Sequence, residues 1–287
     1  AGTVYGPGGR ITGWPVDGRE NAGMRGGKSS AYDGGHRVPL FIRHSKLGEP
    51  RDIESLSAHM DITPTLMQLC DLKRPTDWPP LDGQSLIPAI KSGAPFDSER
   101  VLHSQMHGGN GYVKPGDPWE IGVAMTKRWR LVEGRELYDI QADPSQRTNV
   151  AQQFPRIFER LNAAHLSWFE SLQENMHPTR IHLGSAAENP TDLTSQEWVM
   201  PVGGPPWAKS HVQRRLMKHG SWWVDIRKSG RYRFELSRWP IYIARALDSV
   251  SAGISVGGVE LSKRVSPEQT VATFEATLPQ GPTELTA

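Results

Sequence analysis

The residues best suited to chemistry lie in residues 26–39, which read Gly-Gly-Lys-Ser-Ser-Ala-Tyr-Asp-Gly-Gly-His-Arg-Val-Pro. This segment places Lys28 in a turn bounded by glycines, which have no Cβ and therefore allow close backbone approaches. A lysine held in such a turn can present a compact positive charge to a bound anion. A short Gly-Lys-Ser sequence also fits a flexible surface loop, so the turn alone leaves both interpretations open.

Three polar residues next to this lysine have alternative roles. His36 is a candidate for contacting the same anion, or it packs against the loop. Arg37 is expected to tie the turn to neighbouring carboxylates. Asp33 is expected to form the turn rather than to bind a ligand.

The elements that must position this segment are predicted from their apolar patterns. A short buried strand is expected over residues 38–43, directly after the turn. A helix is expected over residues 57–70, with Ile62, Leu66 and Leu69 on its buried face. Further elements are expected in order along the chain: a turn and short helix at 79–90, strands at 100–106, 122–125 and 129–132, and a helix at 155–172.

The chain changes character in its last third. A polar, proline-rich connector leads to residues 221–226 and 231–236, whose alternating pattern predicts a hairpin. Similar strands follow, so we expect a separate all-β module, a sandwich. Its tryptophans can form the core or stack on sugar rings (Trp222, Trp223 and Trp239).

The composition excludes several classes of protein. The 287 residues carry a net charge of +2 with scattered basic residues, which argues against a nucleic-acid partner. No apolar stretch approaches the roughly 18 to 20 residues that span a bilayer, so no membrane partner is expected. The single cysteine excludes an intrachain disulfide framework and a cysteine-rich metal site.

Four motifs in the same order resemble the type I sulfatases, the formylglycine-dependent arylsulfatase family. Residues 26–39 are similar to the family's Gly-Lys-x-x-x-Tyr-(Glu/Asp)-Gly-Gly-x-Arg-x-Pro segment. Residues 60–66 resemble its Asp-x-x-Pro-Thr-Leu helix, residues 81–86 its Asp-Gly-x-Ser-Leu turn, and residues 129–140 its closing strand pair. The resemblance covers roughly residues 1–175, and the tail is similar to an accessory module of some environmental bacterial sulfatases.

This resemblance implies an α/β fold, namely the C-terminal part of the alkaline-phosphatase-like sulfatase fold, plus an all-β sandwich-like C-terminal module. The expected domains are the C-terminal part of the α/β catalytic domain at 1–98 and a smaller sulfatase subdomain of antiparallel strands plus a helix at 99–175. A linker at 176–210 and a truncated β-sandwich module at 211–287 are expected to follow.

The resemblance also implies site residues. In the family the lysine contacts the sulfate group, so Lys28 is the catalytic candidate. The substrate-binding candidates are His36, His103 and His107, the last two because their strand, by analogy, reaches the mouth of the site. The family's nucleophile is a formylglycine made from Cys or Ser, and calcium is bound by Asp and Asn oxygens. Both sets are expected upstream of residue 1, so no metal ligand is assigned here.

Cys70 is a near match to the nucleophile motif. It has the Cys-to-Arg spacing of Cys-x-(Pro/Ala)-x-Arg, but Leu72 stands where Pro or Ala is required. The resemblance places Cys70 at the end of a structural helix, so we expect a small buried residue without a catalytic role.

The function implied by the resemblance is hydrolysis of sulfate esters, on a sulfated small molecule or a glycan such as a sulfated polysaccharide. The missing N-terminal part of the same protein is the expected partner, and the chain alone is expected to be inactive. Two alternatives stay open: a phosphate or phosphonate ester hydrolase of the same superfamily, and a non-catalytic carbohydrate-binding protein. Family habit implies a periplasmic or extracellular location.

Overall fold

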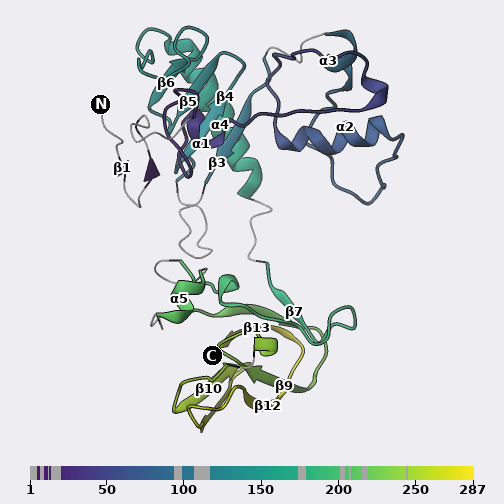
Figure 1. Cartoon of the computed structure of the whole chain (residues 1–287), viewed down its shortest axis with the longest axis vertical. Coiled ribbons are helices and arrows are strands. Elements are labelled where there is room, and N and C mark those ends of the chain that lie inside the picture. Colours follow the sequence, from purple (N-terminus) through teal and green to yellow (C-terminus); the bar gives the residue numbers. More distant parts are fainter. Residues whose placement is uncertain are drawn as a thin grey trace. The chain divides into compact units, whose positions relative to one another are not determined.

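The computed structural model describes residues 5–6, 10–11, 13, 21–93, 99–106, 117–173, 179–200, 204–206, 208–214, 219–243 and 245–287. The chain forms two compact units. The first comprises Ala1–Gly108 and Pro115–Glu174, and the second comprises Gly109–Lys114 and Asn175–Ala287 (Figure 1). The first unit therefore contains both of the domains that the sequence predicts at 1–98 and 99–175. None of the helices in the described parts combines the length and apolar character that a membrane crossing requires.

The first unit is built on a four-stranded antiparallel sheet. Its strands follow the order of the chain: β3 (Leu102–Gln105), β4 (Gly122–Met125), β5 (Trp129–Val132) and β6 (Glu136–Asp139). These bounds confirm the strands predicted from the sequence at 122–125 and 129–132. Every residue of β4 and β5 is buried, so both faces of this sheet are covered.

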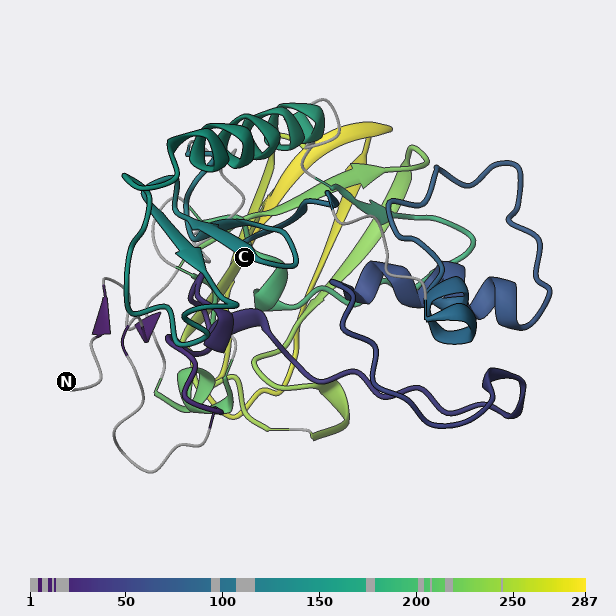
Figure 2. The same cartoon turned by 90° about the horizontal axis from the view of Figure 1, so that it is seen from above.

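Successive residues of these strands point to opposite faces, and each face has its own core. On one face Ala124, Leu131 and Leu137 pack against the long helix α4 (Pro155–Gln173) through Leu161. On the other face the core contains Ala31 and Tyr32 of the glycine-rich segment, together with residues of the alternate positions (Val123, Met125, Val132 and Tyr138). Figure 2 shows the strands between α4 and the short helix α1 (Asp33–His36). The sheet therefore forms the support for the glycine-rich segment.

Residues 38–93, here called the α2 lobe, contain short helical elements. These are η2 (Ser45–Leu47), η3 (His59–Asp61), α2 (Ile62–Leu69) and α3 (Ile87–Ser92). Their own core is small, because it consists of Leu47, Leu69 and Ile87 with Ile90 packed against them.

Three sequence predictions for this lobe are wrong. Residues 38–43 form no strand and pair with no described strand, and the predicted buried side chains are exposed. On α2 only Leu69 is buried, whereas Ile62 and Leu66 are exposed. Cys70, at the C-terminal end of α2, is exposed too. In each case no described segment packs over these apolar side chains, so they stay exposed.

The described residues of the second unit form two sheets. The larger has the order β11-β10-β13-β8-β7 and the smaller pairs β12 with β9. The strands are β7 (Ile181–Leu183), β8 (Trp222–Ile226), β9 (Gly230–Leu236), β10 (Ser251–Val256), β11 (Val259–Arg264), β12 (Ala272–Leu278) and β13 (Gly281–Thr286). One core contains residues of both sheets, among them Val224, Val256 and Phe274. The shorter elements are η4 (Ser195–Glu197), α5 (Lys209–Gln213) and η5 (Ile241–Ile243).

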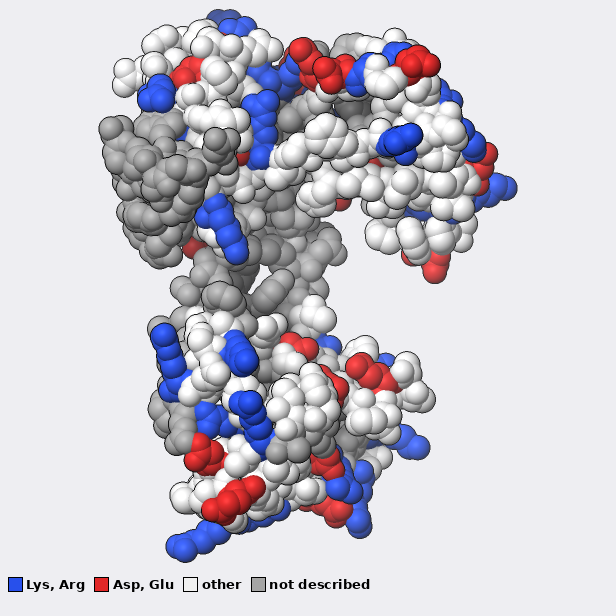
Figure 3. All heavy atoms as spheres, viewed as in Figure 1, with Lys and Arg blue, Asp and Glu red and all other residues white. Residues whose placement is uncertain are grey.

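The predicted hairpin of β8 and β9 is wrong. β8 pairs with β13 and β7, whereas β9 pairs with β12 in the other sheet. Each strand alternates more and less buried positions, and that alternation is satisfied equally well when the connection crosses between sheets. A short antiparallel pair, β1 (Tyr5–Gly6) and β2 (Arg10–Ile11), lies near the N-terminus of the first unit. Charges of both signs are spread over the face seen in Figure 3.

Candidate functional site

Lys28 occupies the second position of a four-residue turn. The backbone N–H of Ser30 donates to the carbonyl oxygen of Gly27 over 3.1 Å. The N–H of Gly27 in turn donates to Oγ of Ser30, also over 3.1 Å. Ser29 has a φ of 70°, in the left-handed region. The side chain of Lys28 is exposed, and it makes no hydrogen bond or ion pair with another described residue. The turn therefore offers an ammonium group that no described carboxylate neutralises.

Glycine is required at positions around this turn because neighbouring atoms leave no room for a Cβ. Gly26 has a φ of 83°, and a Cβ added to it would lie 2.3 Å from Oγ of Ser30. A Cβ at Gly34 would lie 2.6 Å from the carbonyl oxygens of Arg25 and Gly26. Contacts this short do not occur with real Cβ atoms, so the backbone has to shift if a larger residue is placed here. The expected close backbone approaches are confirmed.

The segment after the turn is fixed by a buried ion pair. Asp33, the first residue of α1, is completely buried and accepts a hydrogen bond of 2.8 Å from Nε of Arg130 in β5. Its backbone N–H donates to Oε1 of Gln146 over 2.8 Å. Burial lowers the pKa of Arg130, although Asp33 opposes that shift. Arg37 lies 3.6 Å from Oδ2 of Asp33, which agrees with its expected role of tying the turn to a carboxylate.

His36 packs against the same loop. Its Nε2 lies 3.3 Å from the carbonyl oxygen of Ala31 and 3.8 Å from Oδ1 of Asp33. Burial lowers the pKa of His36, so the neutral ring is favoured, although Asp33 acts in the opposite direction. Of the two roles open to this histidine, packing is the one observed. A contact with substrate stays a prediction.

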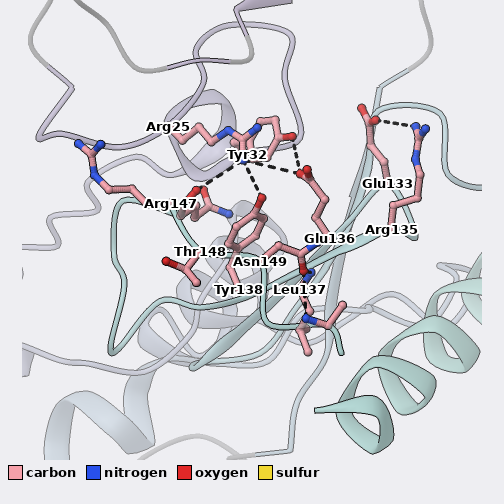
Figure 4. Close-up of polar contacts among 12 residues, drawn as sticks. Arg25, Tyr32, Glu133, Arg135, Glu136, Leu137, Tyr138, Arg147, Thr148 and Asn149 are labelled. Atoms are coloured by element: carbon pink, nitrogen blue, oxygen red, sulfur yellow. Dashed lines mark hydrogen bonds and ion pairs between the residues drawn. The ribbon is translucent and has the colours of Figure 1, made fainter. Parts of the chain in front are cut away.

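A second polar network joins the glycine segment to the sheet (Figure 4). Nη1 of Arg25 donates to the hydroxyl of Tyr138 over 2.6 Å, and its guanidinium lies 3.9 Å from the ring centre of Tyr32. The hydroxyl of Tyr32 donates to Oε2 of Glu136 over 2.6 Å. Burial raises the pKa of Tyr32 and of Tyr138, and Glu136 adds to both shifts. The sequence did not single out Arg25, because nothing near it in the chain marks its partners.

The motif over residues 60–66 proves to be a structural anchor. The buried carboxylate of Asp61 receives two hydrogen bonds from Arg100, of 2.9 and 2.7 Å. It also accepts from the backbone N–H groups of Ala58 and Gln84, each over 2.8 Å. Burial acts to raise the pKa of Asp61, but Arg100 and these amides outweigh it, and the pKa lies below its ordinary value. Thr65 completes the anchor by accepting from the N–H of Leu86 over 2.8 Å.

His103 belongs to a cluster of aromatic rings between the sheet and α4. Its Nδ1 lies 3.3 Å from Nδ1 of His165, and its ring stacks on Trp168 at 4.9 Å. Nε2 of His165 lies 2.8 Å from the carbonyl oxygen of Pro118, while its ring stacks on Trp119 at 3.8 Å. Burial, together with the neighbouring His165, lowers the pKa of His103 to about 4. His107, the other substrate-binding candidate on this side, lies outside the described residues.

The described residues do not fit the family's metal or nucleophile. Among them, no three His, Cys, Asp or Glu side chains converge in a way that could hold a metal ion. Cys70 is exposed at the end of α2, remote in sequence from the glycine turn and followed by the unsuited Leu72. We therefore derive no chemical step through calcium or formylglycine. These residues supply a turn that the Asp33–Arg130 ion pair holds in place and that carries the positive charge of Lys28.

Comparison with known proteins agrees with the motifs. Residues 8–72 match the family model described as Sulfatase. The sequence is 29% identical over 145 residues to N-acetylgalactosamine-6-O-sulfatase of Bacteroides thetaiotaomicron, an alignment that covers 48% of this chain and 28% of that protein. It is 25% identical over 223 residues to arylsulfatase K of Gallus gallus, covering 74% of this chain and 38% of that protein.

Within residues 8–72 this chain is therefore similar to the sulfatase family. The chain spans between about a quarter and two-fifths of the length of the two sulfatases named above. The alignment with arylsulfatase K, at 223 residues, is longer than the 175 residues to which the motifs extend. A solved structure from work on glycosaminoglycan metabolism by Bacteroides thetaiotaomicron matches 52% of this chain and 32% of its own, with 24% identity and a TM-score of 0.41.

Proposed function

We propose that this chain is part of a sulfuric ester hydrolase and that the ammonium group of Lys28 contacts the sulfate group of the substrate. The observation that carries this proposal is that Lys28 is exposed and that no described carboxylate neutralises it, at the second position of a turn held by Gly26, Asp33 and Arg130. The sulfatase match over residues 8–72, which include this turn, supports it.

The role of the turn follows from the charge of the reaction. During cleavage of a sulfate ester, negative charge spreads over the non-bridging oxygens and the leaving oxygen. A fixed ammonium group stabilises that charge best when it does not have to reorganise, so the backbone that carries it must be rigid. The Asp33–Arg130 ion pair and the Arg25–Glu136 network supply that rigidity here.

The remaining parts of the site are proposed to lie outside these 287 residues. A formylglycine would supply the nucleophile and a calcium ion would neutralise the sulfate oxygens, with ligands upstream of residue 1. A sulfated glycan is the proposed substrate, in keeping with a relative named as a sulfatase of N-acetylgalactosamine. We also propose a periplasmic or extracellular location, which is usual for this family.

Parallel kinetics test this function. The protein that contains this chain is assayed with 4-nitrophenyl sulfate and 4-nitrophenyl phosphate, and the 287-residue chain is assayed separately. We expect a higher kcat/KM for the sulfate with the longer protein, and no turnover by the chain alone. A preference for phosphate would favour the phosphate or phosphonate ester hydrolase. Appreciable turnover by the chain alone would refute the assignment of the nucleophile to residues outside it.

A second candidate function, glycan binding, rests on a hollow in the second unit. Its volume is about 410 Å³ and its lining includes Trp239, Arg238 and Arg245. An indole beside guanidinium groups suits an anionic sugar. Asp248 also lines the hollow and lies 3.5 Å from Nη1 of Arg238, so the anion would compete with this ion pair. Trp222 is buried in the core and cannot serve. Binding of a sulfated glycan by the full chain, lost in Trp239→Ala and retained in Trp223→Ala, would favour this function.

A further inference from the structure

Gln146, in the loop between β6 and α4, is a buried polar residue that has no part in the function proposed above. Its side chain is completely buried, and its backbone has a φ of 51°, in the left-handed region that residues with a Cβ rarely adopt. Nε2 of its side chain has no hydrogen-bond partner among the described residues. Both features cost free energy, and a residue held in such a conformation is a candidate for a functional role.

The contacts of Gln146 fall on either side of the Lys28 turn. Its Oε1 accepts a hydrogen bond of 2.8 Å from the backbone N–H of Asp33, which follows the turn. Its backbone carbonyl oxygen lies 3.5 Å from Nη1 of Arg25, which precedes the turn. The N–H of Gly34 donates to the carbonyl oxygen of Arg25 over 2.8 Å, so the two ends of this segment are also joined directly. Gln146 therefore contacts both ends of the segment that carries the ammonium group.

The loop that carries Gln146 is itself fixed by hydrogen bonds. Oδ2 of Asp143 accepts from the backbone N–H groups of the two residues that follow Gln146, over 2.6 and 2.8 Å. Oδ1 of Asn149 accepts from the N–H of Leu137 in β6 over 3.1 Å, which joins the loop to the sheet (Figure 4). The position of the sheet is therefore passed through this loop to the Lys28 turn.

This contact differs in kind from the ion pair of Asp33 with Arg130. Arg130 binds the carboxylate of Asp33, which is separated from the backbone by rotatable bonds. Gln146 binds the backbone N–H of Asp33 and so restricts the path of the chain itself. The difference matters for catalysis, because a displacement of about 1 Å in a group that stabilises the transition state can lower the rate about 100-fold.

We propose that Gln146 is a positioning residue for Lys28, which holds the backbone on both sides of the turn so that the ammonium group meets the sulfate without rearrangement. The proposal rests on the proposed function, because it requires that Lys28 contacts the sulfate. Gln146 acts through Lys28 and not on the substrate, since its own side chain is completely buried.

Amide hydrogen exchange in the 287-residue chain tests the positioning without reference to catalysis. Gln146→Met keeps the length of the side chain but has no acceptor, so the N–H of Asp33 is left buried without a partner. The amides of Asp33, Ser30 and Gly34 are expected to exchange about 10- to 100-fold faster than in the parent chain. Gln141→Met, the same change at an exposed glutamine of the first unit, is the control and is expected to be silent. Unchanged exchange at these three amides would overturn the proposal.

A second variant and a reference strand separate positioning from a general loss of stability. Gln146→Asn suits the left-handed backbone better, but its carbonyl group is one methylene too short to reach Asp33. It is expected to accelerate the same three amides, and it serves if Gln146→Met does not fold. The amides of β5 are the reference. An equal acceleration there would show that Gln146 supports the whole unit and would overturn the proposal.

Kinetics of the longer enzyme test whether Gln146 acts through Lys28. With 4-nitrophenyl sulfate, Gln146→Asn is expected to lower kcat about 10- to 100-fold and to change KM by less than about twofold. In a Lys28→Ala background, the same substitution is expected to have no further effect on kcat/KM. Equal losses in both backgrounds would show a purely structural role and overturn the proposal. If Lys28→Ala alone leaves kcat/KM unchanged, the proposed function fails, while the exchange of Ser30 and Gly34 still decides whether Gln146 holds the turn.

Discussion

Arg130 donates a hydrogen bond of 2.8 Å from Nε to Oδ1 of Asp33, and the two residues are 97 positions apart in the chain. Both side chains are buried, with 6% and 0% of their surface exposed. The pair joins the start of α1, five residues after Lys28, to the middle of β5. It links the sheet to the segment that carries the proposed sulfate contact, beside the hydrogen bond from Arg25 to Tyr138.

Removing one partner of this pair is expected to destabilise the first unit. Arg130→Met leaves the Asp33 carboxylate buried without its main partner, which costs about 3–5 kcal/mol in comparable cases. The quantity to measure is the free energy of unfolding, obtained from the urea dependence of amide exchange in β5. Arg135→Ala, which removes a surface ion pair with Glu133, is the control and should cost about 1 kcal/mol or less. Equal effects of the two substitutions would show that the buried pair contributes little.

Crowding at Gly26 can be separated from its backbone conformation. Gly26 and Gly48 both have positive φ, of 83° and 78°, but only Gly26 has atoms within 4 Å of an added Cβ. Both alanine substitutions should lose about 1–3 kcal/mol from the backbone with positive φ, which at Gly48, where ψ is −152°, is a conformation that essentially only glycine adopts. Gly26→Ala should lose a further 1–3 kcal/mol, roughly, from the contact with Ser30. Equal urea midpoints for the two variants would contradict the geometry of the turn.

The His103 cluster predicts a stability that depends on pH. The pKa of His103 is about 4 in the folded chain, against 6.5 for an ordinary histidine. Between these values the unfolded chain binds a proton that the folded chain does not. The free energy of unfolding therefore has its full value above about pH 6.5 and falls as the pH drops toward 4.

Urea midpoints of the first unit between pH 7 and pH 4.5 test this dependence. His103→Gln is expected to reduce the slope of the profile, because it removes one titrating ring, whereas His36 and His165, whose pKa values burial also lowers, keep part of the slope. His59→Gln, at an exposed histidine, is the control and is expected to keep the slope of the parent chain. A profile that His103→Gln leaves unchanged would assign the pH dependence to other groups.

The local patterns of the sequence were sufficient to predict strands of the four-stranded sheet and the helix α4. β4 is a short apolar run and β5 is apolar except for Arg130, both strands end at turns, and α4 repeats apolar residues at helical spacing. The glycine turn was predictable for a similar reason, since the need for glycine at residues 26 and 34 is set by neighbours close in the chain.

What the sequence could not provide was the long-range partners. Arg130, Arg100 and His165 are central to the buried networks, but their partners lie 97, 39 and 62 residues away. His165 lies between Ala164 and Leu166 in α4, and nothing in the sequence indicated that this polar ring is completely buried. The opposite failure occurred at residues 38–43, where the pattern of a buried strand is present and the described residues contain nothing that buries it.

The central claim is that the ammonium group of Lys28 contacts the sulfate in the enzyme of which this chain is part. The most direct measurement is kcat/KM for 4-nitrophenyl sulfate with Lys28→Ala in that enzyme, beside Lys73→Ala at another exposed lysine of the first unit. The account predicts a loss of about 100- to 1,000-fold for Lys28→Ala, as for removal of other fixed groups that stabilise charge, and no more than about a twofold change for the control. Equal rates for the two variants would contradict it.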